Sequence, residues 1–160
     1  MKALVKLFLF GAILCPLISI IVSCSEEADC SMNARPMMQC YLYTIGDGQT
    51  ERNDTLESLT VTAIDTDSTI INNQQKVHDL SLPLRYAKDS TILVFHYSET
   101  LRDTLIICQT NTPYFLSMDC GYQMKQTIRS VSYSRHKLDS IHISNKDASI
   151  YGTENLKLFY

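Results

Sequence analysis

The sequence predicts an all-β fold, an antiparallel β-sandwich that is immunoglobulin-like in general architecture. Three observations favour this fold. Apolar positions 59, 61 and 63 alternate with Thr60 and Thr62, which is the period of a half-buried strand. Short β-branched runs are separated by turn-forming residues at roughly 8- to 12-residue intervals, as in sandwiches. No segment repeats apolar residues with the period of a helix over three turns.

The predicted strands follow one another along the second part of the chain. Their β-branched or alternating segments are residues 40–45, 59–63, 80–84, 91–97, 104–108, 114–118, 127–133, 138–143 and 156–160. Turns are predicted where Gly, Asn, Asp, Ser or Pro gather, at residues 46–48, 52–54, 72–73, 110–113, 144–147 and 152, and a polar stretch at residues 98–103 separates two apolar runs. Residues 91–97 and 104–108 are expected to form a central hairpin buried on both faces, because both runs are almost entirely apolar. Pro83 is expected on an edge strand or at a bulge, because it cannot donate a ladder hydrogen bond.

The first 23 residues have the layout of a secretory signal peptide. Lys2 and Lys6 precede residues 7–23, an uncharged apolar run. A transmembrane anchor is the competing interpretation, since 17 residues lie at the lower limit of the roughly 17 to 25 that span a bilayer. Pro16 inside the run disfavours that interpretation.

The end of the apolar run, Ile21-Val22-Ser23-Cys24, resembles the lipobox of bacterial lipoproteins. The resemblance implies cleavage after Ser23 and a diacylglycerol with further acyl chains, such as palmitate, on Cys24, which would anchor the protein to a membrane. An ordinary signal peptide is the alternative. Residues 25–27 (SEE) resemble the surface-export signal of Bacteroidetes lipoproteins, or else form a solvated acidic tether.

We therefore divide the chain into a signal peptide (1–23), a lipidated tether (24–36) and a β-sandwich domain (37–160). The expected location is the outer membrane, on its periplasmic or cell-surface face. The formal charge of −3 and the lack of a Lys- and Arg-rich stripe exclude nucleic acid as a partner. An apolar share of 45% excludes an intrinsically disordered chain.

Four cysteines remain after cleavage and lipidation: Cys30, Cys40, Cys108 and Cys120. An exported compartment permits disulfides. We favour a Cys30–Cys120 disulfide, because neither residue depends on the register of a buried strand. Cys40 and Cys108 lie in predicted strands and form either a second disulfide or two buried thiols. A zinc site is the weakest alternative, since there is no Cys-x-x-Cys pair.

Several short motifs together resemble a family of small, uncharacterised Bacteroidetes lipoproteins whose domain has no assigned function. The motifs are the lipobox, Cys30, residues 81–84 (SLPL), 103–105 (DTL), 120–121 (CG), 141–145 (IHISN) and 155–160 (NLKLFY). This resemblance covers nearly the whole mature chain. It implies an all-β domain in the cell envelope, and it supplies no catalytic residue.

Five sites resemble the O-glycosylation sequon of exported Bacteroidetes proteins, in which Asp precedes Ser or Thr and then an aliphatic residue or Thr. The modified residues would be Thr55, Ser68, Ser90, Thr104 and Ser140. The competing interpretation is that these dipeptides are junctions between turns and strands, where Asp ends the turn. Both interpretations can hold together.

The sequence contains no recognisable catalytic motif. It lacks the Gly-x-Ser-x-Gly, His-Glu-x-x-His and phosphate-loop patterns, and His96 lies in an apolar strand where a hydrogen-bonded structural role is the expectation. We therefore expect no enzyme activity, no cofactor and no metal; a hydrolase with a site assembled from separate loops is the alternative.

We expect a lipid-anchored, non-enzymatic interaction or structural module of the cell envelope, with an envelope protein or a glycan as its partner. The alternative is a glycan- or peptide-binding accessory module of an outer-membrane complex. Nine Tyr residues supply aromatic surface for such a module, or are strand residues with the hydroxyl at the rim.

Overall fold

The computed structural model of the protein describes residues 34–46, 48–64 and 68–160. These residues belong to one compact unit, which spans Ser31–Tyr160. Residues 1–33 lie outside the described part, so the predicted signal peptide, Cys24 and Cys30 lie outside it as well. The first described strand starts at Met37.

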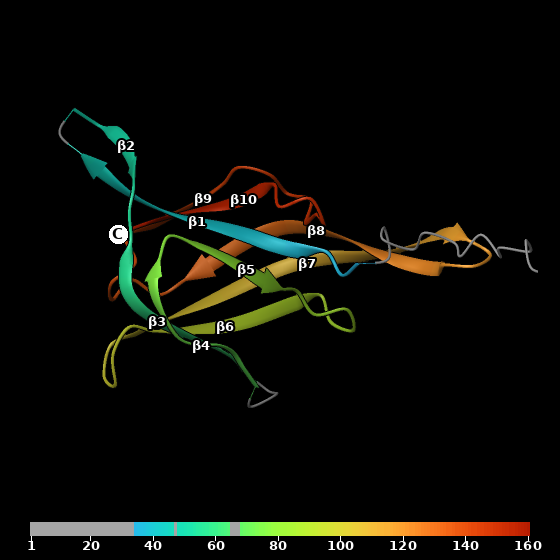
Figure 1. Ribbon diagram of the computed structural model, residues 1–160, viewed down its shortest axis with the longest axis horizontal. Coiled ribbons are helices and arrows are strands. Elements are labelled where there is room, and N and C mark those ends of the chain that lie inside the picture. Colours follow the sequence, from blue (N-terminus) through green and yellow to red (C-terminus); the bar gives the residue numbers. More distant parts are fainter. Residues whose placement is uncertain (1–33, 47, 65–67) are drawn as a thin grey trace, which may run out of the picture. The chain divides into compact units, whose positions relative to one another are not determined.

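Ten strands form the described domain, and the predicted all-β sandwich is confirmed (Figure 1). The strands are β1 (Met37–Gly46), β2 (Thr50–Asn53), β3 (Leu56–Ala63), β4 (Ser68–Val77), β5 (Asp79–Pro83), β6 (Ser90–His96), β7 (Arg102–Ser117), β8 (Gly121–Tyr133), β9 (Ser140–Ile143) and β10 (Glu154–Phe159).

The first sheet is mixed rather than purely antiparallel. β1 pairs along one edge with β10, in parallel, and β10 pairs with β9. The other edge of β1 pairs first with β5 and then with β2. Pro83 lies at the end of β5, which pairs with β1 alone, so the prediction of an edge position is confirmed.

The second sheet is antiparallel throughout, with the strand order β4-β3-β6-β7-β8. The core lies between the two sheets, and alternate residues of each strand fill it. The first sheet contributes Met38, Cys40, Leu42, Leu80, Leu82, Leu156 and Leu158; the second contributes Leu59, Val61, Leu93, Phe95, Leu105, Ile107 and Ile128. All of these side chains are almost completely buried.

Four sequence predictions about the strands need correction. The β6–β7 hairpin is buried on one face only, since Ile106 is exposed on the outer face of the sheet. Residues 110–113 form no turn, because β7 runs through them while it pairs with β8. Residues 72–73 lie inside β4, where Asn73 adopts a φ of 46° beside a register shift, a conformation that Asn tolerates. β2 and β4 are polar strands that the apolar pattern did not reveal.

β7 and β8 extend well beyond their neighbours (Figure 1). β6 pairs with β7 only from Arg102 to Cys108, so most of the ribbon from residue 109 to residue 128 has no third strand. At the base of the ribbon, Thr127 forms a single bridge with Asp147. We call this two-stranded ribbon the arm. Isolated hairpins are marginally stable in water, so the arm depends on contacts at its base.

Amide side chains supply those contacts. Asn111 Nδ2 donates to the carbonyl oxygens of Arg85, Tyr86 and Lys88, at 3.0, 3.0 and 2.8 Å. Gln126 Nε2 donates to Asn111 Oδ1 at 2.9 Å across the ribbon. The base of the arm is therefore fastened to the loop between β5 and β6.

Candidate functional site

The outer part of the arm carries a cluster of large, exposed apolar side chains. We call residues 113–124 the arm tip. Met118 is 90% exposed, Tyr122 is 73% exposed and Phe115 is 52% exposed. Phe115 and Tyr122 are cross-strand partners whose ring centroids lie 5.3 Å apart in an edge-to-face arrangement. The two rings support each other and still face solvent, as is typical of a contact surface.

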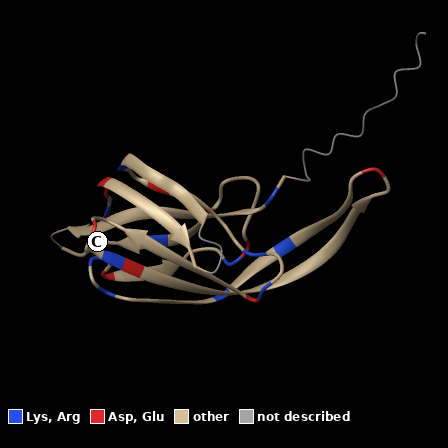
Figure 2. Cartoon of the chain, turned by 90° about the horizontal axis from the view of Figure 1, so that it is seen from below, with Lys and Arg blue, Asp and Glu red and all other residues tan. Residues whose placement is uncertain are grey.

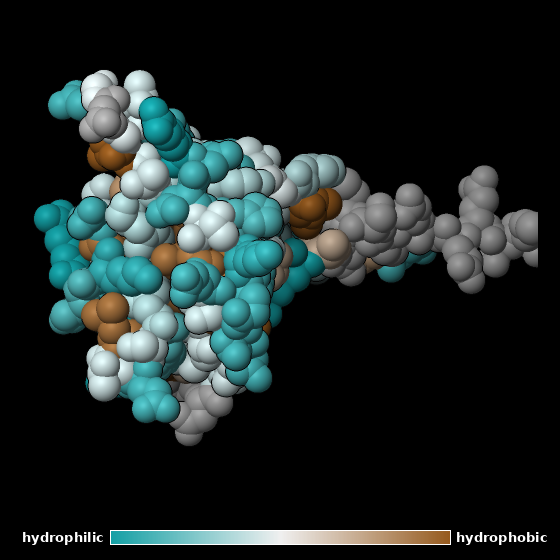
Figure 3. All heavy atoms as spheres, turned by 60° about the vertical axis from the view of Figure 1, so that its left-hand side comes forward, coloured by the Kyte–Doolittle hydropathy of each residue, from teal (hydrophilic) through white to brown (hydrophobic). Residues whose placement is uncertain are grey.

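The arm tip is nearly free of charge. Asp119 is the sole charged residue from position 113 to position 124. Figure 2 shows that the charged residues gather on the sandwich, whereas the arm is almost bare of them. Figure 3, which brings the opposite end of the domain forward, shows a mostly hydrophilic surface with isolated hydrophobic patches. The arm tip therefore carries less charge than the end of the sandwich that Figure 3 brings forward.

The arm is also where the start of the described chain is held. Gln123 Nε2 donates to the carbonyl oxygen of Ala34 at 2.6 Å. Arg35 donates to the carbonyl oxygen of Leu84 at 2.6 Å, and its guanidinium lies 4.7 Å from the centre of the Tyr86 ring. Residues 34 and 35, which belong to the predicted tether, are thus fastened to the arm and its neighbouring loop.

Cys120, at the turn of the arm, is disulfide-bonded. Cys40 and Cys108 are free thiols, so the partner of Cys120 lies outside the described residues. Cys30, the partner that the sequence favours, also lies outside them. Within the described residues, the Gln123–Ala34 hydrogen bond connects the arm with the residues just before β1.

The alternative of a Cys40–Cys108 disulfide is wrong, because both residues are free thiols. Cys40 points into the core from β1, whereas Cys108 follows the buried Ile107 and points to the outer face of the other sheet. Burial, followed by the negative charge of Glu154, raises the pKa of the Cys40 thiol far above its ordinary value. Cys108 is only partly buried, so it is not the core thiol that the sequence suggested.

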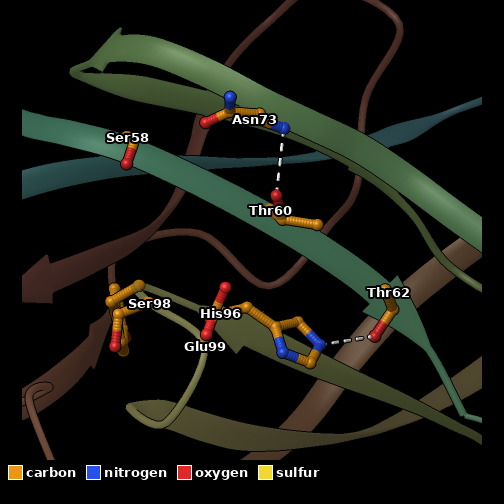
Figure 4. Close-up of a pocket in the computed structure, with 8 residues that line it drawn as sticks. Ser58, Thr60, Thr62, Asn73, His96, Ser98 and Glu99 are labelled. Atoms are coloured by element: carbon orange, nitrogen blue, oxygen red, sulfur yellow. Dashed lines mark hydrogen bonds between the residues drawn. The ribbon is translucent and has the colours of Figure 1, made fainter.

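A polar hollow of about 380 Å³ lies on the outer face of the second sheet (Figure 4). Ser58, Thr60 and Thr62 line it from β3, together with His96 from β6. Thr62 Oγ1 and His96 Nε2 lie 3.0 Å apart, and the backbone N–H of Asn73 donates to Thr60 Oγ1 at 3.0 Å. His96 thus has the structural partner that the sequence predicted. The carboxylate of Glu99 also lines the hollow, and the hydroxyl, amide and carboxylate groups together suit a polar ligand that carries hydrogen-bond donors.

Asp103 is a buried carboxylate whose role the sequence did not reveal. Its Oδ1 accepts from Ser134 Oγ at 2.7 Å and from the backbone N–H of His136 at 2.8 Å. Its Oδ2 accepts from the N–H groups of Lys137 and Leu138, both at 2.9 Å. Asp103 is therefore a clamp that fixes the turn between β8 and β9.

The clamp also determines the ionisation of Asp103. Burial alone would raise the pKa of Asp103, but the hydrogen bonds from Lys137, His136, Leu138 and Ser134 outweigh it and lower the pKa to about 2. The carboxylate is ionised and fully engaged with donors, so it is poorly suited to act as a general base.

The five predicted glycosylation residues differ in accessibility. Thr55 and Ser68 are exposed, just before β3 and at the start of β4. Ser90, Thr104 and Ser140 lie within strands and are half-buried. The backbone N–H of Thr104 is also occupied, since it donates to Ser134 Oγ at 2.9 Å. Thr55 and Ser68 are therefore the more accessible acceptors.

Two further properties concern metals and membranes. Within residues 34–46, 48–64 and 68–160, no group of three or more His, Cys, Asp or Glu side chains is placed to hold a metal ion. In the same part of the chain, no helix has the length and hydropathy that a membrane crossing requires.

Sequence reasoning missed the arm tip and the Asp103 clamp. A signal for the arm was present, because residues 114–118 and 120–122 combine aromatic residues with a complete lack of basic ones. The arm was missed because a turn was predicted at residues 110–113. In the structure, Pro113 lies within the ribbon, opposite Met124. The clamp had no local signal, since its donors lie more than thirty positions away.

No curated protein and no solved structure matches the chain. A protein family does match, over residues 58–160, which includes every strand from β4 onwards and the whole arm. The sandwich, the arm and the clamp are therefore features of a domain whose role has not been assigned. The chain belongs to the Family of unknown function (DUF6452).

Proposed function

We propose that the protein is a lipoprotein, cleaved after Ser23 and acylated at Cys24, whose sandwich acts as a non-enzymatic interaction or structural module at the outer membrane. The observation that carries the proposal is the disulfide at Cys120. Disulfides persist in oxidising compartments and are rare in the cytosol, so this bond favours export. The charged start, the apolar run and the lipobox-like residues 21–24 supply the route and the anchor.

The non-enzymatic part of the proposal rests on how the domain uses its ionisable groups. Asp103 is occupied by the turn that it clamps, and Glu154 accepts from the Tyr43 hydroxyl at 2.7 Å. Lys157 pairs with Glu51 on the surface of the first sheet. These groups stabilise the fold, and the exposed aromatic tip offers contact area rather than reactive groups.

Metabolic labelling with an alkyne analogue of palmitate tests the anchor. The native chain and Cys15→Ser should incorporate the label, because Cys15 leaves with the signal peptide. Cys24→Ser should incorporate no label and should no longer be recovered in the membrane fraction. Labelled C24S, or native protein with an intact leader by mass spectrometry, would contradict the proposal. Protease treatment of intact cells then distinguishes the cell-surface face from the periplasmic face.

The polar hollow favours a second candidate, a glycan-binding accessory module. Its hydroxyl and amide groups, with His96 at one wall, are the kind of hydrogen-bonding partners that a sugar requires. Isothermal titration with envelope oligosaccharides tests this candidate. Thr62→Val should weaken binding about tenfold, the effect of roughly one lost hydrogen bond. Thr44→Val, on the other sheet, should bind as the native protein does. Equal binding by both variants would remove the candidate.

Two modifications accompany the proposal. We assign Cys30 as the partner of Cys120, because Cys15 and Cys24 are removed or acylated. Non-reducing peptide mapping should recover the 30–120 pair.

We also assign O-glycans first to Thr55 and Ser68, the exposed acceptors. Glycopeptide mass spectrometry of protein from its own host should find at least one of them modified; unmodified peptides at both would refute that assignment.

A further inference from the structure

We propose that the arm tip is a membrane-contact surface, which places Phe115, Met118 and Tyr122 in the interfacial layer of the bilayer that holds the acylated Cys24. This inference rests on the proposed lipid anchor. It adds a second point of attachment, so the domain would lie in a fixed orientation on the membrane rather than move freely on its tether.

The first argument is chemical. Aromatic side chains favour the boundary between lipid head groups and acyl chains, where a ring is partly buried and a hydroxyl stays hydrated. The paired rings of Phe115 and Tyr122 present this combination at an end of the domain, and Met118 between them in sequence is almost fully exposed. A surface with one charged residue, Asp119, loses little hydration energy when it leaves water at that boundary.

The second argument is the length of chain between the anchor and the arm. Ala34, which is held by Gln123 on the arm, follows Cys24 by ten positions (34 minus 24). An extended chain covers about 3.3 to 3.6 Å per residue, so this segment spans at most about 35 Å. A disulfide from Cys120 to Cys30 would shorten the connection further. The arm tip is therefore confined close to the bilayer, where its effective concentration at the lipid surface is high.

The third argument is the contrast with the opposite end of the domain. The β1–β2 hairpin also carries an exposed apolar side chain, Ile45, which is 60% exposed. Its cross-strand partner is the charged Glu51, and the next pair along the hairpin contains the charged Arg52. Ile45 is thus an apolar residue among charged neighbours, and it supplies a matched control position.

The test uses the full acylated protein in vesicles of phosphatidylethanolamine and phosphatidylglycerol, with and without brominated acyl chains. The chain contains no Trp, so Met118→Trp introduces a single indole, and Ile45→Trp introduces one at the opposite end. We expect M118W emission to shift to the blue on reconstitution and to be quenched by brominated lipid several-fold more strongly than I45W emission. Phe115→Glu in the M118W background should reduce this quenching, whereas Ile106→Glu, on the outer face of β7, should not.

Flotation of the vesicles separates the two proposals. A protein that fails to float refutes the lipid anchor, and the membrane-contact surface with it. A protein that floats while M118W remains red-shifted and is quenched no more than I45W keeps its anchor and overturns the membrane contact. In that case a polypeptide partner that shifts M118W emission would assign the arm tip to protein recognition instead.

Discussion

Replacing Asp103 with Asn should destabilise the domain, because the substitution removes the charge that four donors surround. The pKa of Asp103 is about 2 in the folded protein, against an ordinary value of 3.8. At about 1.36 kcal/mol per pKa unit, this difference contributes roughly 2 kcal/mol at neutral pH. In D103N the new side-chain amide would also face donors on both sides, since Oδ1 accepts from Ser134 and the His136 N–H and Oδ2 accepts from the N–H groups of Lys137 and Leu138. We therefore expect a loss of roughly 2 to 4 kcal/mol.

Urea unfolding, followed by circular dichroism, measures this loss. For a slope of about 2 kcal/mol per molar, the midpoint of D103N should fall by roughly 1 to 2 M. Asp139→Asn is the matched control, since Asp139 is an exposed residue of the same turn region, and its midpoint should stay unchanged.

The pH dependence of the unfolding free energy gives a sharper comparison between the native protein and D103N. Because the folded pKa is depressed, the contribution of Asp103 is fully present above about pH 4 and disappears as the pH falls through about 2. The stability gap between the native protein and D103N should therefore narrow by roughly 2 kcal/mol between about pH 6 and pH 2. A gap that stays constant over that range, or a D103N midpoint equal to that of the native protein, would refute the clamp.

Three further perturbations test the core and the first sheet. Leu93→Ala should cost about 2 to 5 kcal/mol in urea unfolding, because Leu93 is completely buried, and a smaller loss would show that the core collapses into the space. Cys40 should react with a thiol reagent only after unfolding, because burial first and Glu154 second raise its pKa; rapid labelling of the native protein would contradict this. Glu154→Gln should lower the pKa of Tyr43 from about 12 towards 10, because the hydrogen bond to Glu154 is the main cause of its elevation; an unchanged ultraviolet titration would contradict it.

The apolar strands of this domain could be predicted because the two-residue alternation of apolar and polar side chains is visible within a short segment of sequence. Leu59 and Val61 alternate with Thr60 and Thr62, and each residue's face follows from its position. β4 escaped prediction because its residues are mostly exposed and polar, so hydrogen bonding to β3 alone makes it a strand. β7 was divided in two because a local turn signal at residues 110–113 was given more weight than cross-strand pairing.

By itself, the sequence determined the all-β class and the edge position of Pro83, because periodicity and proline chemistry act over a few residues. It also predicted a targeting segment from the spacing of residues 1–24. Tertiary structure alone decided the parallel pairing of β1 with β10, the donors around Asp103 and the exposure of the arm tip. Each of these features depends on whether residues that are far apart in the chain come into contact in the folded domain. A local pattern carries no information about such encounters, which is why the candidate site emerged only from the folded domain.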